Sequence, residues 1–313
     1  MKIGRLAALL LTAALVVAGC GSGDRRGAAE LVVGATADSE STLLADIYVA
    51  ALRSYGFPAR AATAADPMAK LDSGDFTVVP AFTGEVLRAL QPSATALSDK
   101  EVYRAMVSAL PEGIAAGDYA TAAEDKPALM ITQATADGWG SSELSVLARH
   151  CDGLVVGKVG GGATPAMVGP CRLPAAGEFP DGAAMFARLR DGRLTAAWTS
   201  TANPAVPAGL VMLTDGKPAL IRADNVVPLY RRNALNERQL LAVNEVGGVL
   251  DTAALVDMRR QVAGVRTRRR WPPVGWASIR WGVERFHRPK RGARRPQRCE
   301  AGTSRPSTGM NSR

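Results

Sequence analysis

The sequence contains very little histidine: only His150 and His287 occur in 313 residues. Metal sites built on several histidines and Ser-His-Asp hydrolase triads both depend on this residue, so the composition argues against both. The chain also has no C-x-x-C pair, no nucleophile elbow, and no glycine pattern that would bind a phosphate or a dinucleotide. We therefore expect no metal, no cofactor and no enzymatic activity, with a hydrolase that uses carboxylates alone as the enzyme class left open.

Most of the chain has no excess of positive charge, although the formal net charge is +9. From Gly264 to Arg313, 14 Lys and Arg residues oppose two Asp and Glu residues, so this segment carries +12 and the rest carries −3. A nucleic-acid-binding domain would carry its basic residues on the folded body. The sequence therefore predicts no nucleic-acid partner.

The segment after Gly264 breaks with the composition before it, because it has many prolines, three of the five tryptophans and no periodicity. Such a composition does not support a packed core. We interpret residues 265–313 as a basic tail that is disordered or is read from a shifted frame. The alternative is a genuine basic tail that contacts anionic lipid or cell wall.

Aromatic residues make up only 5% of the chain, so the core must be built mainly from Ala, Val and Leu. The length allows one large or two modest domains. Apolar runs alternate with helical patterns: a strand is predicted at 31–34 before a helix at 41–55, and a strand at 76–79 before a helix at 84–90. This alternation predicts an α/β fold of mostly parallel sheets with flanking helices.

The second half of the chain continues with shorter elements. The run ALMITQ at 128–133 predicts a strand, and residues 141–148 predict a helix. Another strand is predicted at 210–213, and the turn Asp-Gly-Lys that follows predicts a hairpin with residues 219–222.

The N-terminus has the pattern of an export signal. Lys2 and Arg5 precede the apolar run Leu6–Val17, which is too short for a transmembrane helix, and the segment ends in Val-Ala-Gly-Cys at Cys20. We interpret residues 1–20 as a lipoprotein signal peptide, with Cys20 as the lipidated residue and residues 21–30 as a tether. The alternative is an ordinary signal peptide in which the cysteine has no role.

Export places the chain in an oxidising compartment, where Cys151 and Cys171 are predicted to form a disulfide. They enclose a glycine-rich loop, and closing a loop of this length contributes roughly 3 kcal/mol to stability. The alternative is a pair of buried free thiols. Cys299 lies in the basic tail and has no evident partner.

Three blocks of the sequence carry a resemblance to a known family: VVGATADSESTLLADIY at 32–48, KLDSGDFTVVPAFTGEVL at 70–87, and the C-terminal block at 222–264. They resemble segments of the osmoprotectant-type substrate-binding proteins of ABC importers, which bind glycine betaine, choline or carnitine. The resemblance covers residues 31–264 in total.

The resemblance implies a two-lobed type II periplasmic-binding fold with a cleft between the lobes. By this comparison, lobe one takes residues 31–128 and 210–264, and lobe two takes residues 129–209. The two chain crossings near residues 128–133 and 196–213 would form the hinge.

The resemblance also implies a ligand site with an aromatic cage, because ring faces attract a quaternary ammonium group. Phe82 falls at a family tyrosine, and Trp198 falls near another cage position. Glu85 stands at a family threonine and Thr36 at a family lysine. These departures predict a ligand that has changed from betaine to a polyol, a sugar-like compound or an aromatic compound. The candidate ligand-binding residues are Thr36, Asp38, Ser39, Glu40, Phe82, Thr83, Glu85, Asp125, Trp198 and Thr199.

Each of several candidates has a purely structural alternative. Aromatic residues pack in cores, small polar residues cap helices, and acidic residues complement helix dipoles in the first turn. The alternatives are a core role for Phe82 and Trp198, a helix cap for Ser39 and Thr83, a first-turn charge for Glu40 and Glu85, and a turn for Asp125.

The predicted function is solute capture outside the cytoplasmic membrane, by hinge closure over a small osmoprotectant-like solute. The partners implied are that solute, an ABC permease with its ATPase, and the membrane through the lipid anchor. The alternative is a cell-envelope lipoprotein that has this fold and no role in transport.

Overall fold

The computed structural model describes residues 30–161 and 164–267, all of which belong to one compact unit. The predicted signal peptide, the lipidation at Cys20, nearly all of the tether and the basic tail from residue 268 lie outside the described residues. Within the described part, no single helix is long and apolar enough to span a membrane, and one bent helix pair meets that criterion by length and composition.

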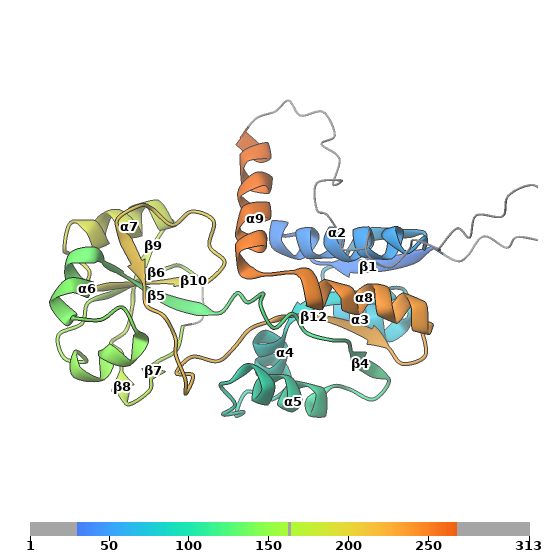
Figure 1. The fold of residues 1–313 in the computed structure, drawn as a ribbon, viewed down its shortest axis with the longest axis horizontal. Coiled ribbons are helices and arrows are strands. Elements are labelled where there is room, and N and C mark those ends of the chain that lie inside the picture. The colour runs from blue at the N-terminus through green and yellow to red at the C-terminus, as the bar shows by residue number, and fades with distance from the viewer. Residues whose placement is uncertain (1–29, 162–163, 268–313) are drawn as a thin grey trace, which may run out of the picture. The chain divides into compact units, whose positions relative to one another are not determined.

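The first sheet has five strands in the order β2-β1-β3-β12-β4 (Figure 1). Strands β1 and β3 run parallel to each other and β1 runs parallel to β2, whereas β12 is antiparallel to both β3 and β4. The strand bounds are β1 Leu31–Ala35, β2 Ala59–Thr63, β3 Val78–Phe82, β4 Ile114–Ala116 and β12 Val226–Arg231.

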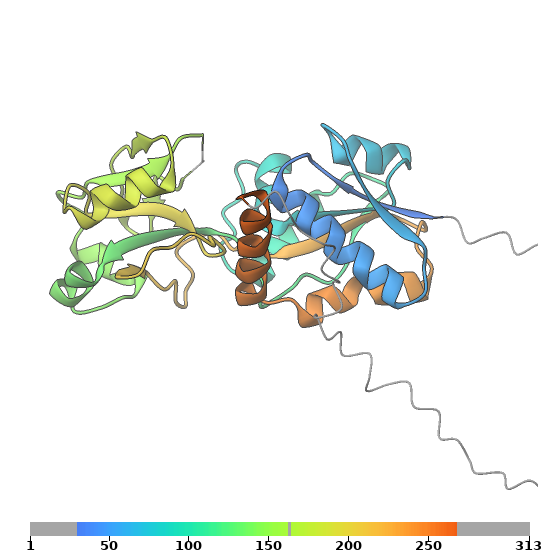
Figure 2. The same cartoon turned by 90° about the horizontal axis from the view of Figure 1, so that it is seen from above.

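Helices cover both faces of this sheet, because apolar side chains alternate across its strands. Helices α2 and α8 lie side by side on one face (Figure 1), and α9 stands beside the N-terminal end of α2 (Figure 2). Helices α3, α4 and α5 pack on the other face through a buried cluster that includes Leu71, Leu87 and Met106. The helix bounds are α2 Ser39–Ser54, α3 Pro67–Ser73, α4 Thr83–Leu90, α5 Asp99–Ala109, α8 Glu237–Val249 and α9 Thr252–Thr267. We call this sheet with its helices lobe one.

The second sheet has five strands in the order β11-β5-β10-β6-β9. Strand β10 is antiparallel to β5 and parallel to β6, so this sheet is mixed as well. Its strands are β5 Pro127–Thr132, β6 Val156–Val159, β9 Gly177–Phe179, β10 Ala196–Ser200 and β11 Leu210–Met212. Also present are α6 Gln133–Trp139, the 3-10 helix η1 Leu144–Arg149, α7 Gly182–Arg190 and the short pair β7 Met167–Val168 and β8 Cys171–Arg172. We call this sheet with these elements lobe two.

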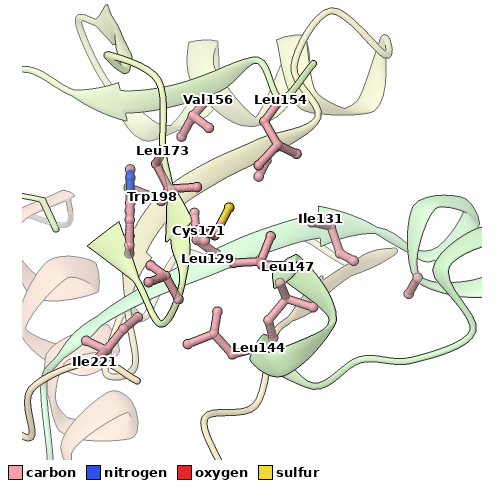
Figure 3. Close-up of a cluster of buried hydrophobic side chains, with 14 residues drawn as sticks. Leu129, Ile131, Leu144, Leu147, Leu154, Val156, Cys171, Leu173, Trp198 and Ile221 are labelled. Atoms are coloured by element: carbon pink, nitrogen blue, oxygen red, sulfur yellow. The ribbon is translucent and has the colours of Figure 1, made fainter. Parts of the chain in front are cut away.

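The core of lobe two gathers aliphatic residues around Trp198 and Cys171 (Figure 3). Cys151 and Cys171 form the predicted disulfide, which closes the glycine-rich loop onto this cluster. Leu129 and Trp198 are paired across β5 and β10 within the same core. These buried side chains give lobe two an apolar core of its own.

The second crossing between the lobes lies later in the chain than the sequence predicts. Strand β11 pairs with β5, and Leu213 and Ile221 are buried in the core of lobe two. Arg222 is the first residue to bind lobe one, because its guanidinium donates to the Ala94 and Ala96 carbonyls. The boundary at residue 210 is therefore wrong: β11 belongs to the sheet of lobe two, and the crossing that follows packs on lobe two until Arg222.

The predicted hairpin at 219–222 is also wrong, since this segment forms no strand. The Asp215 carboxylate instead accepts hydrogen bonds from the backbone N–H groups of Leu220 and Ile221, at 2.9 and 3.2 Å. Its Oδ2 also lies 3.2 Å from Lys126 Nζ, in a pair whose side chains are 4% and 12% exposed. A buried ion pair thus joins the two crossings.

One predicted helix differs in detail. Residues 141–148 were expected to be α-helical, but the helical part is the 3-10 helix η1 at Leu144–Arg149. Glu143, just before η1, has extended backbone and forms an isolated β-bridge with Thr214 in the second crossing. This pairing keeps the residues before Leu144 out of the helix.

Candidate functional site

A large cavity, of about 1050 Å³, is lined by residues of both lobes. Its walls come largely from the ends of strands: Thr36 follows β1, Phe82 ends β3, and Thr199 and Ser200 end β10. In α/β sheets, ligands bind outside the carboxyl ends of the strands, because strand ends and helix N-termini present polar groups there. This cavity is therefore the candidate ligand site.

Eight of the ten candidate residues line this cavity, and their contact with a ligand stays a prediction. The eight are Thr36, Asp38, Glu40, Phe82, Glu85, Asp125, Trp198 and Thr199. Ser39 lines a second, smaller cavity of about 280 Å³ beside α9. Thr83 is fully buried, and its hydroxyl accepts a hydrogen bond from the Asn225 N–H at 3.0 Å.

Thr36 and Asp38 organise the start of α2. Asp38 is the N-cap, and its Oδ1 accepts hydrogen bonds from the N–H groups of Glu40 and Ser41 at 3.0 and 2.8 Å. The Thr36 hydroxyl donates to the other carboxylate oxygen of Asp38. Burial alone would raise the pKa of Asp38, but the Ser41 N–H, the Thr36 hydroxyl and Arg259 outweigh it, so the pKa lies below its ordinary value. Asp38 is a fixed negative charge at the cavity edge.

The two aromatic residues on the cavity wall are largely buried in their own lobes. Phe82 is 8% exposed at the end of β3, and Trp198 is 4% exposed within the core of lobe two. Each therefore has a core role and also presents an edge to the cavity. The core interpretation made from the sequence is confirmed for both rings, and contact of either ring with a ligand stays a prediction.

Asp224 lines the cavity and was not among the candidate residues. Its Oδ1 accepts hydrogen bonds from the N–H groups of Gly84 and Glu85, at 2.7 and 3.0 Å, and so caps α4 from a distant part of the chain. Gly84 permits this approach, because a Cβ at that residue would lie 2.4 Å from the Ala223 carbonyl oxygen. Burial raises the pKa of Asp224 to about 7, against the lowering effect of these two N–H groups.

Arg259 on α9 forms ion pairs with two of the carboxylates that line the cavity, Glu40 and Asp125. Its guanidinium pairs with Glu40, lies 2.9 Å from Asp125 Oδ2, and donates to the Ala202 carbonyl at 3.0 Å. Asp125 also accepts a hydrogen bond from the Ala202 N–H at 3.0 Å. Burial lowers the pKa of Arg259 to about 10 and raises the pKa of Asp125. The cluster joins α2, the first crossing, the loop after β10 and α9.

The charge of the cavity wall is dominated by carboxylates. The acidic residues on the wall are Asp38, Glu40, Glu85, Asp125 and Asp224, and the basic ones are Arg88 and Lys158. Lys158 pairs with Glu178 at 3.2 Å. Among residues 30–161 and 164–267, no group of three or more His, Cys, Asp or Glu side chains is placed to hold a metal ion.

The sequence did not indicate that Asp224 caps α4 or that Arg259 pairs with two carboxylates, because these partners are remote in the chain. Asp224 caps a helix 140 residues earlier, and no local pattern marks that pairing. Arg259 lies on a helix whose other charged side chains, such as Arg260 and Asp257, pair on the exposed surface. The available signal was the Thr-Gly-Glu junction after β3, which lacks a side-chain cap of its own.

The fold and the cavity define a class of protein: two α/β lobes, joined by two crossings, both line the candidate cavity. Residues 29–170 match the family model described as the substrate binding domain of ABC-type glycine betaine transport systems. This match covers less than half of the chain. No curated protein matches the chain significantly.

Solved structures show the same fold. Apo YehZ from Escherichia coli is 17% identical with a TM-score of 0.59, and covers 76% of this chain and 93% of its own. A glycine betaine/carnitine/choline ABC transporter structure is 16% identical with a TM-score of 0.60, again over 76% of this chain and 93% of its own. These similarities confirm the predicted type II periplasmic-binding fold.

The family match over residues 29–170 agrees with the resemblance predicted from the sequence, and the matched family is described as a substrate binding domain. The description names the binding of a substrate within an ABC transport system.

Proposed function

We propose that this protein captures a small osmoprotectant-like solute outside the cytoplasmic membrane and delivers it to an ABC permease driven by an ATPase. The observation that carries the proposal is the cavity, which draws its wall from strand ends of both lobes. A solute bound there contacts both lobes at once, so its binding favours the conformation in which the lobes approach each other.

The hinge for this motion is formed by the two crossings. Residues 124–126 lead into β5, and residues 213–222 lead from β11 to β12. The Lys126–Asp215 pair joins the two crossings, with both side chains almost fully buried. A pair of this kind makes the two segments move together, which supports a rigid-body rotation about one axis.

We propose further that Cys20 carries a lipid that anchors the protein to the outer face of the membrane. The Val-Ala-Gly-Cys ending of the signal peptide supports this step. Metabolic labelling with a fatty-acid analogue is expected to mark the protein, and the Cys20→Ala variant is expected to lose both the label and the membrane association. A labelled Cys20→Ala variant would contradict the anchor.

The central experiment is titration calorimetry of the purified protein against betaine, choline, carnitine, polyols, sugar-like compounds, aromatic compounds and small amines. Saturable binding of one class is expected, together with loss of uptake of that compound when the gene is deleted. If no compound binds saturably, the transport role fails and an envelope lipoprotein without transport becomes the better description.

A further inference from the structure

The N-terminus of α4 faces the candidate ligand cavity, and its first N–H groups are already occupied. A helix N-terminus is favourable for an anion, because free N–H groups and the helix dipole both point toward it. Here the Asp224 carboxylate binds the N–H groups of Gly84 and Glu85, at 2.7 and 3.0 Å. Asp224 is 7% exposed, and it lines the cavity. The protein thus fills the anion position with its own side chain.

The remaining wall charges disfavour a solute carboxylate. Arg259 compensates Glu40 and Asp125, and Asp38 is committed to capping α2. Glu85 adds a negative charge beside Asp224, and the Arg88 guanidinium on the same helix acts on Asp224 only through space. On the facing lobe, Lys158 is paired with Glu178. Five carboxylates thus stand against Arg88 and the paired Lys158 on the wall, a balance that favours a cation over a solute anion.

The same wall offers what a hydrogen-bonding cation needs. Carboxylates are acceptors only, and they bind N–H groups of ammonium or guanidinium ions through charge-assisted hydrogen bonds. A quaternary ammonium has no N–H group and depends on ring faces. The wall has two aromatic residues, Phe82 and Trp198, and both are largely buried in their lobes.

We propose that the solute is a small organic cation that carries N–H donors and no carboxylate, such as a protonated amine or a guanidinium compound. Asp224 is the residue that determines this specificity, and Glu85 assists it. The inference rests on the proposed solute-binding function and names the substrate class of the same cavity.

Four related compounds test both parts of the proposal by calorimetry. Ethanolamine has N–H donors and no carboxylate, choline is its trimethylated form, glycine has N–H donors with a carboxylate, and glycine betaine has a carboxylate without N–H donors. Ethanolamine, or its longer analogues putrescine and agmatine, is expected to bind at least about ten-fold more tightly than the other three. Butanediol serves as the neutral counterpart of putrescine.

Variants separate the role of charge from that of shape. Asp224→Asn retains an acceptor for the α4 N–H groups, and it is expected to weaken cation binding about ten-fold while butanediol is unaffected. Glu85→Gln is expected to act in the same direction, whereas Glu237→Gln, a first-turn change on α8 away from the cavity, leaves binding unchanged. Thermal melting of each variant establishes that it is folded.

The outcomes distinguish this proposal from the broader function. Tighter binding of betaine, glycine or a polyol than of any amine overturns the proposed class, while solute binding stands. Cation binding that is unchanged in both Asp224→Asn and Glu85→Gln overturns the role of these residues. If no compound of any class binds, the proposed function itself fails.

Discussion

The Arg259 cluster makes a sharp prediction about stability. The Arg259 side chain is 11% exposed and forms ion pairs with Asp125 and Glu40, whose side chains are 11% and 37% exposed. The Arg259→Ala variant would leave Asp125 charged and buried without its partner. Removing one member of a buried ion pair is strongly destabilising, because the remaining charge has lost its solvation and its counter-ion.

The expected magnitude follows from these exposures. A fully buried pair costs about 3–5 kcal/mol when one partner is removed, and the partial exposure of Glu40 places this case near the lower end, at about 3 kcal/mol. For a folded region of this size, about 3 kcal/mol corresponds to a decrease of about 6–12 °C in Tm.

Thermal unfolding followed by circular dichroism measures this decrease, and Arg260→Ala is the matched control. Arg260 is the next residue on α9 and pairs with Asp257 at 2.6 Å, with side chains 59% and 65% exposed. Exposed pairs contribute about 0–1 kcal/mol, so the control should change Tm little.

A second variant separates lost charge compensation from lost packing. Adding Asp125→Asn to Arg259→Ala removes the uncompensated carboxylate, so part of the lost stability should return. If Arg259→Ala and Arg260→Ala have the same Tm, the cluster does not stabilise the junction between α9 and the lobes. If the double variant is less stable than Arg259→Ala, the loss comes from packing and the electrostatic reasoning is wrong.

Three other perturbations have expected outcomes. Since burial raises the pKa of Asp224 to about 7 from an ordinary value of 3.8, the folded protein binds more protons than the unfolded chain between these values. The stability of the wild type relative to Asp224→Asn should therefore fall as the pH rises through this window, and identical pH profiles in urea unfolding would contradict this. Cation affinity should rise as the pH passes about 7, because Asp224 becomes charged. Asp215→Ala should cost about 3 kcal/mol in urea unfolding, since it leaves two backbone N–H groups without their partner and Lys126 with Glu124 at 3.5 Å, and a loss below about 1 kcal/mol would refute the hinge pair. Reduction of the Cys151–Cys171 disulfide should lower stability by roughly 3 kcal/mol, and non-reducing peptide mapping checks the pairing.

Much of the fold follows from local patterns. The alternation of apolar strands with helices predicted the α/β class, and the helix expected at 41–55 is α2 Ser39–Ser54. Where the prediction failed, a side-chain hydrogen bond or a strand pairing that the local pattern does not show decided the structure. The segment 219–222 lost its hairpin because Asp215 binds its N–H groups, and β11 joined lobe two because β5 offered it a free edge.

The sequence by itself determined the class of protein and the ends of strands at which a ligand cavity forms, since both depend on residues close together in the chain. Eight of ten candidate residues line the cavity for this reason. Only the tertiary structure decided the charge that the cavity presents. Asp224 reaches α4 across 140 residues, and Arg259 reaches Glu40 and Asp125 from the last described helix. Electrostatic compensation acts through space, so no local pattern in the chain encodes it.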